Sequence, residues 1–340
     1  MSDMKLGLML GYWGSTPPTH HIQMAQQAEA LGYDSVWTAE AYGSDAITPL
    51  AWIGAQTSKI RLGTGICQIS ARTPTAMAMA ALTMDHLSNG RMILGLGVSG
   101  PQVVEGWYGA PFSKPLARTR EYIDIIRQVL ARENPVSNDG EHYPLPFTGE
   151  GSWGLGKPLK PIVHPLRADL PIMMGAEGPK NVALAAEIAD GWLPLYYSPF
   201  RQDVYSASLS NAKADFEVTQ GLVVNITDDE EKGLIPIKHM LALYIGGMGA
   251  KDRNFHKELI GRMGFEAEAE KIQDLYLAGK KDEAAVAVPT ALADEISLVG
   301  SVDKIRDRLK AWDETPVTSL NVSARSVVEL QQLADIVLDR

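Results

Sequence analysis

The chain has 340 residues, of which 45% are hydrophobic and 21% are charged, and its formal net charge is -10. Because nucleic-acid phosphates are bound by clustered lysine and arginine, this charge argues against a nucleic-acid partner. The single cysteine, Cys67, allows no disulfide within the chain and fits a reducing compartment. The sequence shows neither a signal peptide nor an apolar run of the ~20 residues that a membrane helix needs, so we expect a cytoplasmic protein without a membrane partner.

Short apolar runs alternate with amphipathic helical segments along the chain. Predicted strands lie at residues 6–10, 35–38, 60–66, 92–96, 171–175, 191–195, 222–226 and 317–322. Predicted helices span 19–31, 47–57, 74–87, 117–131, 179–189, 203–214, 301–312 and 326–338. Thr19, Thr73 and Ser301 are placed to cap three of these helices. Eight strands, each followed by a helix, favour one α/β domain over residues 1–340, a (β/α)8 TIM barrel, with an open doubly wound sheet as the alternative.

Two segments interrupt this alternation. Residues 133–170 interleave proline and glycine too closely for a long helix, and they are too many for a plain connector. We interpret this segment as an insertion that could carry a short hairpin and cover an active site. Residues 228–290 are mostly helical in pattern and form a second predicted insertion.

The working groups of a barrel lie at the carboxyl ends of its strands and in the loops that follow. In this chain those positions are mostly aromatic or small, and few are charged. They are Gly11–Gly14, Ala39–Tyr42, Gly65–Ser70, Gly97–Gln102, Gly175–Lys180, Tyr196 and Tyr197. They include no group of histidine, cysteine and acidic residues at metal-ligand spacing, so we expect no metal. Such a mouth suits a flat heteroaromatic cofactor.

Two glycine-containing loops are candidates for contact with a cofactor. The sequence GAEGPKN at 175–181 follows a strand and opens a helix, where free N–H groups and the helix dipole favour an anion. Gly178 would let a phosphate approach the backbone, although the glycines could equally make only a tight turn. The sequence GLGVSG at 95–100 lacks the acidic partner of a dinucleotide-binding motif, so a Rossmann site is not favoured.

Glu40 is the carboxylate in a strand-end loop otherwise made of Ala39 and Ala41. A carboxylate in apolar surroundings can exchange a proton near neutral pH, which makes Glu40 a candidate catalytic residue. The alternative is a structural hydrogen bond to a loop N–H. Asp85, His86 and Arg91 lie at a helix end on the other side of the barrel, and we expect them to be structural.

Four segments carry a resemblance to a known family. They are GYDSVWTAEAYGSDA at 32–46, RLGTGICQISARTP at 61–74, LTMDHLSNGRMILGLGVSGPQVVEGWYG at 82–109 and GAEGPKNVALAAEIADGW at 175–192. In their order and spacing the chain resembles the luciferase-like monooxygenase superfamily, and more closely its actinobacterial F420-dependent oxidoreductases. The resemblance covers most of residues 4–200 and, more loosely, the C-terminal third.

The resemblance implies where a cofactor would lie. Members similar to F420-dependent glucose-6-phosphate dehydrogenase have a bulge after the third strand with a non-proline cis peptide, which falls here on Gly65-Ile66. The ring-side positions implied are Gly65, Ile66, Gln68, Val98 and Ser99, and the phosphate-side positions are Ala176, Glu177, Gly178 and Pro179. That dehydrogenase has a catalytic histidine where this chain has Glu40, so a sugar-phosphate substrate is not favoured.

The function implied is hydride transfer between C5 of the deazaflavin F420 and a small organic substrate. We expect Glu40 to move the proton, and Trp13, Trp107 and Tyr108 to shape the substrate pocket. One alternative is an FMN-dependent monooxygenase that uses reduced flavin and oxygen, and another is a flavin-binding protein without turnover. An aldolase-like barrel would need a lysine at the end of a strand, and no strand end of this sequence has one. The resemblance also implies a homodimer formed through helices near strands two to four.

Overall fold

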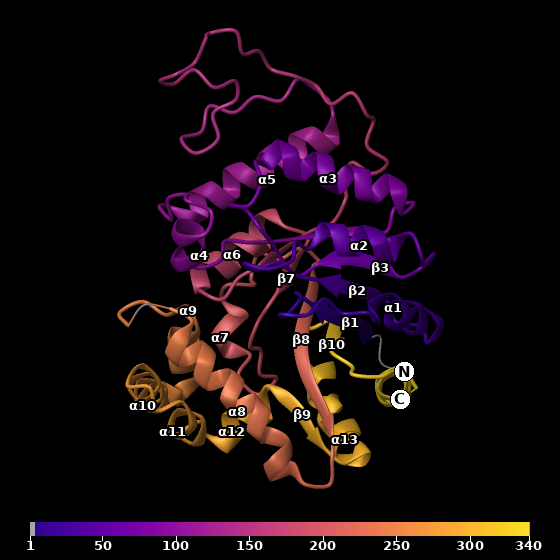
Figure 1. Ribbon diagram of the computed structural model, residues 1–340, viewed down its shortest axis with the longest axis vertical. Helices are drawn as coiled ribbons and strands as arrows, with labels where there is room; N and C mark the ends of the chain where they lie inside the picture. Colours follow the sequence, from indigo (N-terminus) through magenta and orange to yellow (C-terminus); the bar gives the residue numbers. More distant parts are fainter. Residues whose placement is uncertain (1–3, 250, 340) are drawn as a thin grey trace.

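The computed structural model describes residues 4–249 and 251–339. Eight parallel strands close into a barrel, because β10 pairs with both β1 and β8 (Figure 1). In barrel order the strands are β1 (Lys5–Gly11), β2 (Ser35–Thr38), β3 (Arg61–Thr64), β5 (Met92–Gly97), β6 (Ile172–Gly175), β7 (Gly191–Leu193), β8 (Glu217–Ile226) and β10 (Ser319–Val322). The predicted (β/α)8 barrel is therefore confirmed.

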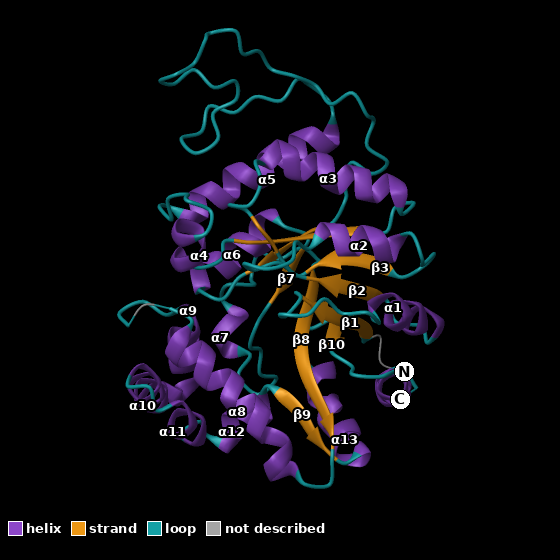
Figure 2. Ribbon diagram, viewed as in Figure 1, coloured by secondary structure: helices purple, strands orange, loops and turns teal. Residues whose placement is uncertain are grey.

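Helices surround the strands (Figure 2). They are α1 (His21–Ala30), α2 (Ile47–Gly54), α3 (Pro74–Leu87), α4 (Pro101–Gly106), α5 (Pro115–Ala131), α6 (Pro179–Ile188), α7 (Asp203–Ser206), α13 (Val302–Asp313) and α14 (Val327–Val337). Thr73 caps α3 and Ser301 caps α13, as predicted. The predicted cap by Thr19 is wrong. His20 takes the N-cap position, and its carbonyl accepts the first hydrogen bond of α1, from the N–H of Met24.

Two strands differ from the prediction. The third stops at Thr64, and after a bulge the short β4 (Cys67–Gln68) pairs with β5. The predicted strand 222–226 is only the second half of β8, and there it pairs with β9 (Ser297–Gly300), a strand that the prediction missed. The first half of β8 pairs with β10 and so closes the barrel. The prediction missed this half because it contains Thr219 and Gln220, which are polar although buried.

The core has two layers. A large apolar cluster fills the space between the strands and the helices, and a small one of Trp37, Ile93 and Met173 lies apart from it. Gly63 makes room for the indole of Trp37, since a Cβ at Gly63 would lie 2.4 Å from that ring. The Nε1–H of Trp37 donates to Ser35 Oγ at 2.8 Å, so this buried donor is satisfied.

The predicted insertion at 133–170 is a long arm that projects from the body of the molecule (Figure 1). Isolated antiparallel bridges join Val136 to Leu159 and Asn138 to Leu145. The expectation that this segment could cover an active site is wrong. The arm connects α5 to β6, and such helix-to-strand connections lie at the amino ends of the strands, away from the catalytic face.

The second insertion follows β8 as a group of helices. These are α8 (Glu230–Gly247), α9 (Phe255–Ile260), the π-helical turn η1 (Gly261–Phe265), α10 (Glu266–Leu277), α11 (Lys281–Val286) and α12 (Thr290–Glu295). They form a lobe beside the barrel, shown in orange in Figure 1. Among the residues that the structure describes, no helix combines the length and the apolar character needed to cross a membrane.

A charged cluster ties together the amino ends of three strands. The guanidinium of Arg61, at the start of β3, donates to Asp34 ahead of β2 and to Glu217 at the start of β8. Both hydrogen bonds to Glu217 measure 2.9 Å. Burial alone would raise the pKa of Glu217, but the hydrogen bonds and charge of Arg61 outweigh it and lower that pKa.

We predict that this cluster makes stability depend on pH. A carboxyl group with a folded pKa below its ordinary value, here 4.5, contributes stability above that value and loses it as the pH falls through the folded pKa. The free energy of unfolding should therefore fall as the pH drops below about 4.5, and less steeply in Glu217→Gln than in the native chain. Urea denaturation at several pH values checks this, with the exposed Glu231→Gln as control. Equal slopes in all three proteins would contradict it.

Candidate active site

The loop after β3 turns inward over the neighbouring strand ends. The peptide between Gly65 and Ile66 is cis, as predicted. A Cβ at Gly97 would lie 2.9 Å from the Ile66 side chain, and one at Gly175 would lie 3.1 Å from it. The side chain of Ile66 therefore occupies the space that these two glycines leave at the ends of β5 and β6. The Ile66 carbonyl accepts from the N–H of Glu40, which links the bulge to the loop after β2.

Gln68 and Ser99 meet beside this bulge. Gln68 is buried in β4, and its Nε2 donates to Ser99 Oγ at 3.3 Å. Ser99 takes a left-handed backbone conformation with φ of 60° next to Val98, which packs against the core. The Oε1 of Gln68 is buried and has no partner among the described residues. A buried acceptor without a partner is costly to leave, so this oxygen is available to a ligand donor.

Glu40 is not in the apolar surroundings that we expected. Its carboxylate lies 3.0 Å from the Arg72 guanidinium and accepts the N–H of Gln68 at 2.8 Å and that of Ala46 at 3.3 Å. The side chain of Glu40 is only 3% exposed. Its oxygens therefore hold three parts of the chain together. Arg72, which lies in the segment ARTP ahead of α3, was missed because nothing in its sequence context indicates this partner.

The loop after β6 opens toward α6. Gly178 is the N-cap of α6, no side chain caps the helix, and a Cβ at Gly178 would meet no atom within 4 Å. Pro179 begins the helix, and the Ala176 carbonyl accepts from Trp192 Nε1 at 2.8 Å, which fixes the loop. The backbone here is thus open to a ligand at the positive end of a helix dipole.

The side chain of Glu177 points toward α9. Its Oε2 lies 2.8 Å from Nδ1 of His256 in α9. These atoms are close but not aligned as donor and acceptor, so the contact is an ion pair only when His256 is protonated. The Glu177 carbonyl accepts from Arg262 Nη2 at 3.0 Å. No pattern in the sequence indicates His256, which lies in the predicted helical insertion.

Two buried or half-buried tyrosines complete this side of the mouth. Tyr196, after β7, packs edge-on against Tyr244 of α8 and against His256, and its hydroxyl has no partner among the described residues. Burial, with nearby Tyr244 and Glu177, raises the pKa of Tyr196 well above its ordinary value. Both Tyr196 and Tyr244 therefore stay neutral hydroxyl groups at physiological pH.

The three residues expected to line a substrate pocket differ in how far their side chains are buried. Trp13 is half-buried, and its backbone N–H donates to Ser44 Oγ. The Nε1 atom of its indole is buried and has no partner among the described residues. The hydroxyl of Tyr108 reaches the Ala41 carbonyl at 3.5 Å, and burial followed by the charge of Glu40 raises the pKa of Tyr108. Trp107 ends α4 with 64% of its surface exposed.

Asp85 and Arg91 have the structural roles that we expected. Asp85 pairs with Arg167 and accepts the N–H of Met92. Arg91 donates to the carbonyls of Gly54, Thr57 and Ile60. Arg118 is also buried, and it donates to Ser70 Oγ at 2.9 Å.

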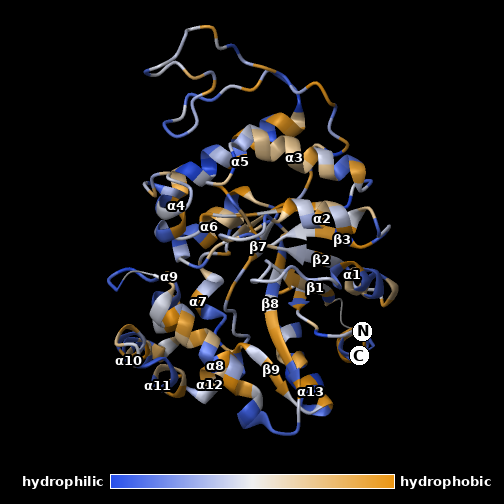
Figure 3. Cartoon of the chain, in the orientation of Figure 1, coloured by the Kyte–Doolittle hydropathy of each residue, from blue (hydrophilic) through white to orange (hydrophobic). Residues whose placement is uncertain are grey.

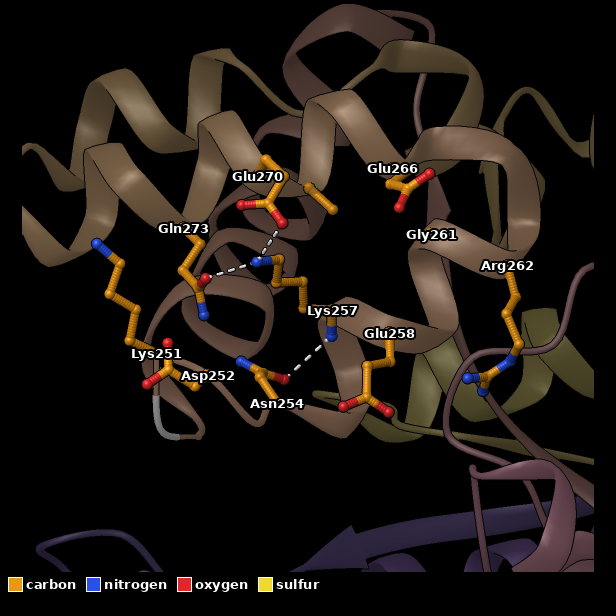
Figure 4. Close-up of a pocket in the computed structure, with 11 residues that line it drawn as sticks. Lys251, Asp252, Asn254, Lys257, Glu258, Gly261, Arg262, Glu266, Glu270 and Gln273 are labelled. Atoms are coloured by element: carbon orange, nitrogen blue, oxygen red, sulfur yellow. Dashed lines mark hydrogen bonds and ion pairs between the residues drawn. The ribbon is translucent and has the colours of Figure 1, made fainter.

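A polar concavity lies between α9 and α10 in the helical lobe (Figure 4). Its lysine and carboxylate side chains largely neutralise one another, as where Lys257 Nζ contacts Gln273 Oε1 at 2.8 Å and Glu270 Oε1 at 2.7 Å. Arg262 also lines it and reaches from it to Glu177. We place the candidate site at the strand ends, because the unpartnered Gln68 oxygen and the open helix N-terminus lie there.

Comparison with known proteins identifies the family. The model of the luciferase-like monooxygenase family matches residues 5–319. A protein of Mycobacterium tuberculosis, named provisionally as a coenzyme F420-dependent oxidoreductase, is 56% identical over 99% of both chains. A 5,10-methylenetetrahydromethanopterin reductase of Archaeoglobus fulgidus is 27% identical over 86% of both.

Solved structures of low sequence identity share the fold. A coenzyme F420-dependent tetrahydromethanopterin reductase of Methanopyrus kandleri superposes with a TM-score of 0.79 at 23% identity, over 99% of both chains. An F420-dependent secondary alcohol dehydrogenase, solved with an F420–acetone adduct, gives 0.77 at 14% identity over 98% of both. From the match over residues 5–319 and the full-length relative, the chain belongs to the luciferase-like monooxygenase family.

Proposed function

We propose that this chain is an oxidoreductase that uses coenzyme F420 to transfer a hydride between C5 of the deazaflavin and a small organic substrate. The observation that carries the proposal is the 56% identity, over 99% of both chains, to a relative named for this cofactor. Two further relatives of lower identity, a reductase and a glucose-6-phosphate dehydrogenase, point the same way, the latter being named as F420-dependent.

The residues at the strand ends fit such a cofactor. The unpartnered Oε1 of Gln68 offers an acceptor to a ring N–H, and the uncapped α6 offers backbone N–H groups and a dipole to a phosphate. On this proposal Gly65, Ile66, Gln68, Val98 and Ser99 hold the ring side. Ala176, Glu177, Gly178 and Pro179 lie at the phosphate side, with Glu177 kept off the phosphate by His256.

Bound deazaflavin supplies or accepts the hydride and activates oxygen poorly, so the protein has to bind, orient and manage a proton. The bulge at Gly65-Ile66 gives one wall of the site, and the Glu40 carboxylate keeps that wall in place through the N–H of Gln68 and through Arg72. We propose Glu40 as the proton-transfer group. Trp13, Trp107 and Tyr108 shape the substrate side.

The surroundings of the site favour a substrate without a phosphate. Glu177 brings a carboxylate to the loop after β6. The loop after β7 carries Tyr196 and Tyr197, and its Arg201 is paired with Glu295. Aromatic and hydroxyl groups recognise neutral, partly apolar molecules better than a dianion. We therefore propose a small neutral alcohol, aldehyde, ketone or enone. We also propose that the protein is cytoplasmic and a homodimer.

Cofactor binding can be tested without knowing the substrate. We predict that the purified chain quenches F420 fluorescence with micromolar affinity and binds FMN at least about tenfold more weakly, which corresponds to roughly 1.4 kcal/mol. The same titration on Gly178→Asp should lose F420 affinity, because the added carboxylate repels the phosphate. Binding of FMN without F420 would replace our proposal by a flavin-dependent monooxygenase.

The role of Glu40 is separable from cofactor binding. If Glu40 moves a proton, Glu40→Gln should lower the rate of F420H2 oxidation by a small enone about 100-fold while the F420 dissociation constant changes by less than about threefold. The exposed Glu231→Gln serves as control. An unchanged rate would remove Glu40 from the reaction. A parallel loss of rate and affinity would show that Glu40 only holds the bulge in place.

A protein that binds F420 without turnover gives a third pattern. The native chain would then quench F420 fluorescence, but it would neither oxidise F420H2 with aldehydes, ketones or enones nor reduce F420 with alcohols faster than buffer does. That result would contradict the proposed activity while leaving the proposed cofactor intact.

A further inference from the structure

Glu177 puts a carboxylate beside the open N-terminus of α6. It directly precedes Gly178, the N-cap that no side chain caps, and its own side chain is 14% exposed. A helix N-terminus binds a phosphate through free N–H groups and the positive end of the helix dipole, so a carboxylate at this place opposes the binding. The charge of Glu177 therefore bears on which phosphates the loop can bind.

The helical lobe holds this carboxylate without supplying a permanent counter-charge. Glu177 Oε2 lies 2.8 Å from Nδ1 of His256, and both atoms are buried without a hydrogen-bond partner among the described residues. Figure 3 shows the lobe below α6, with α9 at the end of the lobe nearest that helix. Since a neutral imidazole carries no charge, His256 offsets the charge of Glu177 only when it is protonated.

The surroundings of Glu177 screen its charge poorly. Tyr196 is 2% exposed, and its hydroxyl has no partner among the described residues. Burial raises the pKa of Tyr196 most, and the neighbouring Tyr244 and Glu177 raise it further. Glu177 adds to the effect of burial on the pKa values of Tyr205 and Tyr244 as well. Charges in such apolar surroundings interact more strongly than they do in water, so the carboxylate also acts on a ligand nearby.

Two positive side chains oppose the charge of Glu177. Arg262 of η1 donates from Nη2 to the Glu177 carbonyl at 3.0 Å, and Lys180 is exposed in the first turn of α6. With a neutral histidine, these three residues leave at most one surplus positive charge, since Glu258 and Glu266 line the concavity that Arg262 also lines. A ligand with one negative charge balances that surplus, whereas a second negative charge on the ligand is opposed by the carboxylate.

The phosphates of the two candidate cofactors differ in charge. The phosphate of F420 is a diester, which carries one negative charge at neutral pH. The phosphate of FMN is a monoester, whose second ionisation at about pH 6 gives it a charge of about -2 above neutral pH. The two cofactors therefore differ by about one charge at the end of the molecule that the α6 loop would bind.

We propose that Glu177 is a specificity-determining residue, whose carboxylate makes the phosphate side of the site favour a phosphodiester monoanion over a phosphomonoester dianion. The inference rests on the proposed function, because that function places a cofactor phosphate at the start of α6. The helix dipole, Lys180 and Arg262 attract both kinds of phosphate, and Glu177 opposes the second charge. This selection concerns the phosphate alone, and it is independent of the ring that lies against the bulge.

Three ligands with one common ring test the proposal. They are F420, the deazariboflavin that forms its ring and ribityl part, and the 5′-phosphate of that deazariboflavin, which is a monoester. Fluorescence titrations at about pH 8 keep the monoester doubly charged and histidine side chains ordinarily neutral. The native chain should bind the monoester no more tightly than the phosphate-free ligand, and F420 at least about tenfold more tightly than either.

Glu177→Gln removes the charge with little change in shape. Coulomb energy is proportional to the charge of the ligand, so the gain in the logarithm of affinity should be about twice as large for the monoester as for F420. We expect the affinity to rise about tenfold for the monoester and about threefold for F420, and to stay unchanged for the phosphate-free ligand. Glu177→Asp keeps the charge and should keep the native order of affinities.

Lys180→Gln tests the same balance of charge in the opposite direction. It removes an exposed positive charge, so it should weaken binding of the monoester about threefold, of F420 less than about twofold, and of the phosphate-free ligand not at all. Because Lys180 is exposed, the substitution leaves the buried contacts of the loop intact. Glu231→Gln, which alters an exposed carboxylate on α8, is the control and should bind all three ligands like the native chain.

Several results would overturn the proposal. Equal gains for the monoester and the phosphate-free ligand in Glu177→Gln would show a change of packing rather than of charge. An unchanged affinity for the monoester, or Glu177→Asp behaving like Glu177→Gln, would remove the charge of Glu177 from cofactor selection. In these cases the native chain still binds F420, so the proposed cofactor stands. A native chain that binds none of the three ligands would overturn the proposed function together with this inference.

Discussion

The candidate site depends on space that two glycines leave open. Ile66 can lie over the ends of β5 and β6 only because Gly97 and Gly175 carry no Cβ, which would approach it to 2.9 and 3.1 Å. With Ile66 in that position, the chain pairs with β5 as the short strand β4, and Gln68 becomes buried beside Ser99. The buried acceptor and the wall of the mouth both follow from this packing.

A charged network fixes the bulge from its outer side. The Glu40 carboxylate binds Arg72 and the N–H of Gln68, and the N–H of Glu40 donates back to the Ile66 carbonyl. The carboxylate of Glu40 thereby connects the loop after β2 with the segment after β3. Loss of the Glu40 carboxylate would leave the buried N–H of Gln68 without its partner, and it would leave the Arg72 guanidinium with Asp45 alone, 3.7 Å away. The Glu40 carboxylate thus has a structural role beside the proton transfer that we propose.

Periodicity and local chemistry were enough to predict most of the barrel, whereas the place of the bulge was implied by the family resemblance. Mostly apolar runs of four to seven residues identify strands that are buried on both faces, and Thr73-Pro74 and Ser301 identify helix starts. The first half of β8 escaped because its Thr219 and Gln220 are polar although both are buried. Arg72 and His256 escaped because they contact Glu40 and Glu177 only across long sequence separations, which a local pattern does not contain. The arm was placed at the wrong end because proline and glycine content predicts an irregular segment but not its position.

The central claim is that the Gly65-Ile66 bulge and the N-terminus of α6 together hold a deazaflavin. A crystal structure of the chain with F420 tests it most directly. We predict that the deazaflavin ring lies against the bulge, with a ring N–H donating to Gln68 Oε1 and the phosphate at the N–H groups of Gly178 and Lys180. A ring bound elsewhere, or a phosphate away from α6 while Gln68 Oε1 stays without a partner, would contradict the account.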